Sequence, residues 1–243
     1  MTHRTLLRLS GADAHGFLQG LITNDVDKAQ DGLVYAALLT PQGKYIADFF
    51  VIGHEGGYLV DVATTHAPTV AQRFAMYRLR ADVEIEESPL QVSRGTGPAP
   101  DGALPDPRHP DLGWRIYSDA DHSDTTDWDA LRVTHVIPET GVELTPDTYI
   151  LEAGFERLNG VDFRKGCYVG QEIAARMKHR TELKKGLVRV AVTGNGPIGS
   201  DITADGKAAG TLYTQSGGHA LAHLRFDRAT GDMLSGDFVV TRA

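Results

Sequence analysis

The chain has 243 residues, of which 41% are hydrophobic and 23% charged, so its composition is that of a folded protein and disorder is not the default. Its formal net charge of -8 argues against general nucleic-acid binding and against an anionic membrane surface, although a local basic patch is compatible with it. The N-terminal segment lacks the apolar core of a signal peptide, no apolar run reaches membrane-spanning length, and a single cysteine fits a reducing compartment, so we expect a cytoplasmic protein.

The first third of the chain predicts an α+β layer. Its elements are defined by leucines at alternating and adjacent positions, by helical spacing of apolar residues, and by apolar runs on either side of a Pro-Gln-Gly-Lys turn. In chain order, these elements are a strand at 6–9, a helix at 10–22, a hairpin of strands at 33–40 and 45–52, a strand at 58–62, a helix at 67–79 and a half-exposed edge strand at 83–85. Helices and strands of this kind pack as layers around one core.

The middle of the chain is less regular. Five prolines and three glycines between 95 and 110 disfavour helix and strand, so we expect a long loop or a linker between subdomains. The aspartates between 119 and 129 lack the glycine and glutamate of a calcium loop, and we expect no metal site there. Apolar spacing predicts helices at 128–136 and 148–158.

From Gly186 onward the pattern changes to that of strands. Valines alternate with other residues from 188 to 192, and Asp205-Gly206 is typical of a hairpin turn. We therefore expect a small separate antiparallel β-barrel. The expected domains are an N-terminal α+β subdomain at 1–93, a second α+β subdomain at 94–185, and the barrel at 186–243.

The segment Arg164-Lys165-Gly166-Cys167-Tyr168-Val169-Gly170-Gln171-Glu172 contains the only cysteine of the chain. The neighbouring cations would stabilise a thiolate, and the glycines allow a tight turn or the close approach of a ligand. The alternative is that Cys167 is a small buried hydrophobic residue in a bent loop, and that Gln171 and Glu172 only begin a helix. Residue spacing leaves both interpretations open.

The pattern Lys-Gly-Cys-Tyr-x-Gly-Gln-Glu, from Lys165 to Glu172, resembles the signature of the YgfZ family at all seven fixed positions. The family comprises folate-binding proteins related to the aminomethyltransferase (T-protein) of the glycine cleavage system, and includes mitochondrial iron-sulfur assembly factors. The resemblance extends over nearly the whole chain. It implies T-protein-like, folate-binding α+β subdomains followed by a small C-terminal antiparallel β-barrel.

The resemblance also implies where folate binds. The stretch Tyr149-Ile150-Leu151-Glu152-Ala153-Gly154 is similar to the stretch whose glutamate recognises the pteridine ring, which assigns that role to Glu152. A carboxylate can accept two hydrogen bonds from the aminopyrimidine edge of a pterin. The ligand would be tetrahydrofolate or a one-carbon derivative. The other residues expected to contact it are Asn24, Lys165, Gly166, Tyr168, Gln171 and Glu172.

Asp48 and Cys167 are the candidate catalytic residues. T-protein uses an aspartate from a Gly-Gly-x-x-Asp-Asp strand, and the similar segment from Gly43 to Asp48 keeps only the second acid, with Ala47 at the first position. This departure weakens the case for an aminomethyltransferase.

The function that the resemblance implies is that of a folate-binding accessory protein for assembly or maintenance of iron-sulfur clusters. Such clusters need about four thiolate or imidazole ligands, so a single cysteine cannot hold a cluster. The other ligands must come from an assembly or client protein, a second subunit or a small thiol. The alternatives are a folate-dependent one-carbon transferase, with Asp48 as acid or base, and a binding module in which folate regulates a partner interface.

Overall fold

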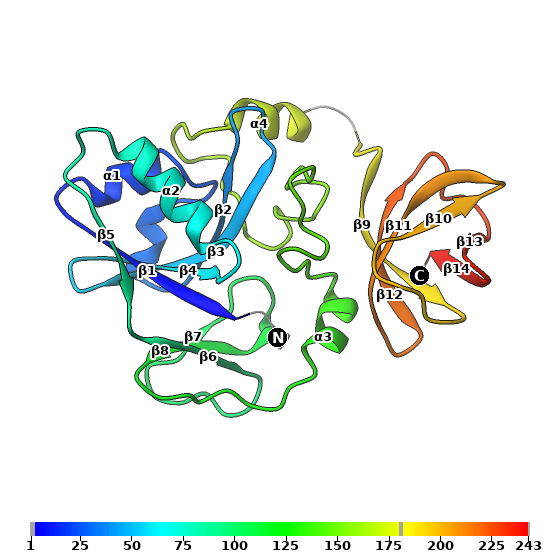
Figure 1. The fold of residues 1–243 in the computed structure, drawn as a ribbon, viewed down its shortest axis with the longest axis horizontal. Helices are drawn as coiled ribbons and strands as arrows, with labels where there is room; N and C mark the ends of the chain where they lie inside the picture. The colour runs from blue at the N-terminus through cyan, green and yellow to red at the C-terminus, as the bar shows by residue number, and fades with distance from the viewer. Residues whose placement is uncertain (1–2, 180–181, 243) are drawn as a thin grey trace. The chain divides into compact units, whose positions relative to one another are not determined.

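A computed structural model describes residues 3–179 and 182–242, which form two compact units (Figure 1). Unit 1 comprises Met1–Thr126 and Phe155–Ala175, and unit 2 comprises Asp127–Gly154 and Arg176–Ala243. The three-part division into 1–93, 94–185 and 186–243 concerns smaller subdomains, and it stays a prediction.

Unit 1 is built on a five-stranded antiparallel sheet with the strand order β2-β3-β4-β1-β5. Its elements are β1 (Arg4–Ser10), α1 (Ala14–Gln19), the 3-10 helix η1 (Val26–Gln30), β2 (Val34–Leu39), β3 (Tyr45–His54), β4 (Gly57–Ala63), α2 (Ala67–Arg78) and β5 (Glu84–Ser88). Figure 1 shows α1 and α2 packed over one face of this sheet. The predicted hairpin, the helix at 67–79 and the edge strand are confirmed.

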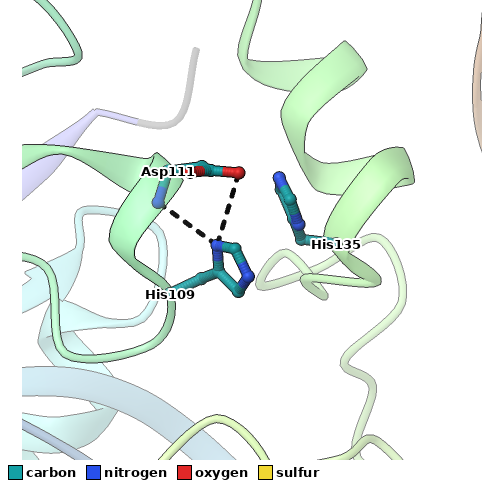
Figure 2. Close-up of side chains that lie close together, drawn as sticks. All are labelled: His109, Asp111 and His135. Atoms are coloured by element: carbon teal, nitrogen blue, oxygen red, sulfur yellow. Dashed lines mark hydrogen bonds and ion pairs between the residues drawn. The ribbon is translucent and has the colours of Figure 1, made fainter.

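The other elements of unit 1 are a three-stranded sheet, with the order β6-β8-β7, and a second 3-10 helix, η2. They are β6 (Gln91–Gly95), β7 (Leu104–Pro105), η2 (Pro110–Leu112) and β8 (Trp114–Ser118). Residues 95–110 are mostly irregular, as predicted, apart from β7, which pairs with β8, and their role as a linker between subdomains stays a prediction. His109 caps η2: its Nδ1 accepts from the backbone N–H of Asp111 at 3.2 Å (Figure 2).

A buried carboxylate joins the two sheets of unit 1. Asp61 of β4 is 1% exposed and accepts hydrogen bonds from Arg4 Nε at 2.5 Å, Arg115 Nη1 at 3.0 Å and Tyr117 Oη at 3.1 Å. Burial alone would raise the pKa of Asp61, but the two guanidinium groups outweigh this effect and lower it. The sheets are therefore held together by charge-assisted hydrogen bonds as well as by apolar packing.

Unit 2 contains a closed antiparallel barrel with the strand order β10-β11-β12-β9-β14-β13. Its strands are β9 (Lys185–Val192), β10 (Ser200–Ala204), β11 (Lys207–Ser216), β12 (His219–Arg225), β13 (Met233–Ser235) and β14 (Phe238–Arg242). Alternate side chains, such as Val190, Ile202 and Leu212, fill its core. The predicted C-terminal barrel is thus confirmed. Two helices complete the fold: α3 (Trp128–His135) in unit 2, and α4 (Gln171–His179), which begins in unit 1.

The sequence-based prediction of a helix at 148–158 is wrong. The segment is a series of turns, and Gly154 has a φ of +81°, which a helix does not accommodate. The backbone carbonyl of Glu152 accepts from the N–H of Leu187 at 2.7 Å. The apolar residues of the segment were misread as helical because they are buried without helical periodicity.

The first helix is also shorter than predicted. Ser10 ends β1, and α1 begins only after Asp13, whose side chain forms no capping hydrogen bond with the helix. Instead the Asp13 carboxylate accepts from the backbone N–H of Asp82 at 2.8 Å. The Asp13 side chain thus makes a long-range contact and not a helix cap.

A buried ion pair fixes α3 against the barrel within unit 2. The Glu143 side chain is fully buried, and its carboxylate accepts from Arg132 Nη2, from Thr214 Oγ1 at 2.6 Å and from the backbone N–H of Glu139 at 2.9 Å. Arg132 lies on α3 and Thr214 on β11, so one carboxylate connects both elements.

We expect Arg132→Met to lower the free energy of unfolding by about 3–5 kcal/mol, because it leaves the Glu143 charge buried without a cation. The double variant R132M/E143M should lose less than the sum of the single losses. Lys207→Met, an exposed substitution on β11, should change stability by less than about 0.5 kcal/mol. Urea unfolding followed by circular dichroism measures the stability of R132M, E143M, the double variant and K207M against that of wild type. A loss below about 1 kcal/mol in R132M contradicts the assigned role.

Candidate functional site

Lys165 is a buried structural contact. It is 9% exposed, and its ammonium nitrogen donates to three backbone carbonyls that follow or end α1: those of Gln19 at 2.8 Å, Ile22 at 2.6 Å and Asn24 at 2.9 Å. Carbonyls at a helix end lack intrahelical partners, and a cation is well suited to them. Nζ also lies 5.2 Å from the ring centroid of Tyr168. Lys165 therefore fixes the segment from Arg164 to Gly170, here called the cysteine loop, to the end of α1.

Burial lowers the pKa of Lys165 to about 8, although the charges of Asp25 and Asp162 act to raise it. At neutral pH the side chain is thus mostly protonated and can donate to all three carbonyls.

Cys167 is exposed, between buried Lys165 and buried Tyr168. A Cβ atom at Gly166 would meet no atom within 4 Å, so there is open space beside the residue that precedes Cys167. The alternative that Cys167 is a buried hydrophobic residue is therefore excluded. The Tyr168 hydroxyl has no hydrogen-bond partner among the described residues, and burial raises its pKa to about 12.

Gly170 is required by packing. Its φ is +85°, and a Cβ atom there would lie 2.6 Å from the carbonyl oxygen of Thr40, in the turn of the β2–β3 hairpin. Gln171 and exposed Glu172 then begin α4, where an acidic side chain in the first turn favours the helix dipole. The end of the motif is thus explained by local structure, and ligand contacts of Gln171 and Glu172 stay a prediction.

Asn24 is buried, with both ends of its amide engaged within unit 1. Its Nδ2 donates to the carbonyls of Tyr35 at 2.8 Å and Asn159 at 2.7 Å. Its Oδ1 accepts from Asp25 N at 2.8 Å and Lys28 Nζ at 3.2 Å. The side chain orders the turn after α1, and its contact with folate stays a prediction.

Asp48 lies on β3, 4% exposed, with one phenol on each carboxylate oxygen. Tyr45 donates to Oδ1 at 2.7 Å and Tyr35 to Oδ2 at 3.0 Å. Burial, and then the Asp48 charge, raise the pKa of Tyr35 well above its ordinary value. Ala47, at the position of the missing acid, is fully buried in the core. Both carboxylate oxygens of Asp48 thus accept a hydrogen bond from a phenol, and an acid or base role for Asp48 stays a prediction.

Glu152 belongs to unit 2, is 8% exposed and lines a hollow of about 690 Å³. Its Oε2 lies 3.4 Å from Lys185 Nζ and 3.4 Å from His223 Nε2. Within the described part of the chain its Oε1 has no hydrogen-bond partner. The other lining residues are Met177, Glu182, Leu183, Lys184, Lys185 and Arg225. The hollow thus combines two carboxylates, those of Glu152 and Glu182, with apolar side chains and three cations.

The predicted residues fall in both units. Unit 1 contains Asn24, Asp48 and the cysteine loop, and joins Asn24 to Lys165 through the Asn24 carbonyl. Unit 2 contains Glu152. Sequence analysis missed the cations beside Glu152, because Lys185 faces Arg225 only through the pairing of β9 with β12. Basic residues at 184, 185 and 225 at strand ends were the available signal.

Known proteins similar to this chain are iron-sulfur assembly factors. The family model described as the CAF17 C-terminal β-barrel domain matches residues 184–243. The mitochondrial iron-sulfur cluster assembly factor IBA57 homolog of Neurospora crassa is 31% identical over 85% of this chain and 56% of its own length. Human IBA57, also named mitochondrial, is 28% identical over 95% of this chain and 78% of its own length. The chain thus spans little more than half of the fungal relative.

A solved structure establishes the fold. The glycine cleavage system aminomethyltransferase T from Bartonella henselae aligns with a TM-score of 0.74, covering 98% of this chain and 82% of that chain at 13% identity. The T-protein-like fold expected from the sequence is confirmed.

The expected cytoplasmic location is wrong, because the similar assembly factors are named as mitochondrial proteins. That prediction rested on the single cysteine and on the lack of a long apolar segment. These features report on redox conditions and membrane insertion, and a reducing organelle imposes the same cysteine usage as a reducing cytoplasm. No helix in 3–179 or 182–242 is both long and apolar enough to cross a membrane.

We expect Lys165→Met to lower the free energy of unfolding by at least about 2 kcal/mol, because three buried carbonyls lose their donor. Lys28→Met removes a half-exposed ammonium paired with Asp162 and should cost less than about 1 kcal/mol. Chemical unfolding at pH 7 measures both; equal losses in the two variants would contradict the structural role.

The pH dependence has a defined sign. The pKa of Lys165 is about 8 in the folded chain, against an ordinary value of 10.5, so the unfolded chain binds more protons between these values. The contribution of this group to stability therefore rises with pH through that window. The stability difference between wild type and K165M should widen from pH 8 to pH 10, and a constant difference would show that the folded pKa is not lowered.

Proposed function

We propose that this chain is a tetrahydrofolate-binding accessory protein for the assembly or maintenance of iron-sulfur clusters. The observation that carries the proposal is exposed Cys167, on a loop that Lys165 fixes, in a motif that matches the YgfZ signature at every fixed position. The similarity of this chain to proteins named iron-sulfur cluster assembly factors supports the proposal.

The exposed thiol suits a shared cluster. Two-iron and cubane clusters need about four thiolate or imidazole ligands, and Cys167 supplies one. A buried thiol could not reach a cluster held by a second protein, whereas an exposed one on a fixed loop can. The remaining ligands would come from an assembly or client protein, or from a small thiol.

The hollow beside Glu152 has the chemistry that folate requires. Its volume of about 690 Å³ lies within the usual range for small-molecule sites. Glu152 Oε1 can accept from an aminopyrimidine edge, and Met177 and Leu183 offer apolar contact to a ring. Lys184 and Arg225 carry charge opposite to that of the ligand's glutamate carboxylates.

A folate-dependent one-carbon transferase is the second candidate. The position of the first acid of the T-protein strand is buried Ala47, and Asp48 is engaged with two phenols. Both observations favour the accessory role over transfer chemistry. Release of a one-carbon unit from methylene-tetrahydrofolate by the purified chain would reverse this preference.

We expect tetrahydrofolate to bind, and Glu152→Gln to weaken binding at least tenfold, about 1.4 kcal/mol, because the charge-assisted acceptor is lost. Glu182→Gln, which removes an exposed carboxylate from the same hollow, should change the affinity less than twofold. Isothermal titration calorimetry decides between these outcomes. No binding by wild type, or equal binding by E152Q, would remove the pocket assignment.

We expect Cys167→Ser to fold and bind folate but to fail to support iron-sulfur enzyme activity in cells that lack the wild-type protein. The side chain is exposed, so the melting temperature should stay unchanged. Complementation and a thermal melt are measured together, and Ser123→Ala, another unit 1 substitution outside the motif, serves as the functional control. Full complementation by a folded C167S protein would show that the thiol is not the functional centre.

A further inference from the structure

The C-terminal end of α2 exposes two apolar side chains. Leu79, directly after the helix, is 87% exposed, and Met76, three residues earlier, is 54% exposed. Only five large apolar side chains are exposed in residues 3–179 and 182–242, and these two lie closest together in the chain. Val70 and Phe74 occupy the opposite side of the helix, which is buried in the core of unit 1. The exposed side is therefore not needed for packing within this unit.

Leu79 has a backbone conformation that disfavours a leucine. Its φ is +47° and its ψ is -104°. Bulky residues rarely adopt a positive φ because their Cβ atom crowds the backbone, whereas glycine does so without strain. Leu79 also buries almost nothing, so neither the turn nor the core explains a leucine at this position. Strained residues of this kind persist where function requires the side chain.

The surface beside these side chains is cationic. Residues 62–81 contain three arginines, at 73, 78 and 80, and no acidic residue, in a chain whose net charge is -8. Arg78 Nη1 donates to the carbonyl of Val83 at 3.3 Å. Arg73 and Arg80 form no ion pair or side-chain hydrogen bond within 3–179 and 182–242. Two guanidinium groups are therefore available to a partner.

We propose that Arg73, Met76, Leu79 and Arg80, here called the α2 surface, bind a protein partner that presents an acidic amphipathic helix. Carboxylates of that helix pair with the two arginines, whose planar guanidinium groups match them, and its apolar side chains cover Met76 and Leu79. Apolar residues three apart fit a partner helix whose own anchors recur at i, i+3 and i+4.

The composition of the α2 surface is that of an interface. Arginine and methionine are enriched at protein interfaces and lysine is depleted, and residues 62–81 contain no lysine. The α2 surface lies in unit 1 and includes no residue of the cysteine loop or of the Glu152 hollow. The proposal therefore does not rest on folate binding.

Two other classes of partner fit the α2 surface less well. The phosphates of a nucleic acid would pair with the arginines, but they offer no apolar contact to Met76 and Leu79. A lipid surface requires a broad apolar helix face, and that face of α2, with Val70 and Phe74, is buried. An acidic helix satisfies both the charged and the apolar residues.

Fluorescence anisotropy of a labelled synthetic peptide, titrated with the full chain, tests the proposal. The peptide has leucines at positions i, i+3, i+4 and i+7 and glutamates between them, and a second peptide has lysines in place of the glutamates. We expect saturable binding of the glutamate peptide and binding at least about tenfold weaker for the lysine peptide, because like charges oppose the arginines.

Two variants with the same loss of charge locate the binding site. Arg80→Gln should weaken binding of the glutamate peptide at least about fivefold, as truncation of an important interface residue does. Lys207→Gln, at an exposed position of β11, is the matched control and should bind like wild type.

Leu79→Gly separates binding from folding. Glycine tolerates the φ of +47°, so the melting temperature should stay unchanged or rise. Binding of the glutamate peptide should nevertheless weaken at least about fivefold, because an apolar contact is lost. A residue that mattered only to the fold would show the opposite pattern.

The proposal is overturned if the two peptides bind alike or if neither binds, because charge then selects no partner. Equal binding by R80Q and K207Q would place the peptide on another surface. A lower melting temperature of L79G would show that Leu79 serves the fold. Binding of the chain to phosphatidylglycerol vesicles, without binding of the glutamate peptide, would identify a lipid-binding surface instead.

Discussion

The site in unit 1 depends on one buried ammonium group. Lys165 satisfies three carbonyls at the end of α1 and thereby fixes the loop that carries Cys167, in which a Cβ atom at Gly166 would meet no atom within 4 Å. The constraint explains why a lysine, a glycine and an exposed cysteine occur together: the lysine anchors, the glycine leaves space, and the thiol is presented to solvent. A cation in the motif thus acts through backbone carbonyls, and its effect on Cys167 is one of position.

The remaining chemistry is divided between two settings. In unit 1, Asp48 is 4% exposed and accepts a hydrogen bond from a phenol on each carboxylate oxygen, which suits a stable fold better than proton transfer. In unit 2, Glu152 keeps one carboxylate oxygen without a hydrogen-bond partner in the described chain, beside cations and apolar side chains. A protein that binds folate without transferring a one-carbon unit would need an available acceptor such as Glu152, and would not need an acid or base such as Asp48.

The sequence predicted those elements whose signals are local. The β2–β3 hairpin has a glycine turn between apolar runs, and the barrel strands alternate regularly, so both were recognised. Residues 148–158 were misread because burial there follows turns and long-range contacts such as Leu187 N to Glu152 O. For the same reason, neither the carbonyl contacts of Lys165 nor the pairing of Lys185 with Arg225 could be predicted: each joins segments far apart in the chain.

The most direct measurement is hydrogen–deuterium exchange of the chain with and without excess tetrahydrofolate, because it locates the ligand without altering the protein. If folate occupies the Glu152 hollow, amides in residues 150–154 and 182–187 should exchange more slowly in its presence. Exchange should be unchanged around Ser93 and Arg94 of β6. Protection confined to residues near Asp48, or no protection at a folate concentration that saturates binding, would contradict the assignment.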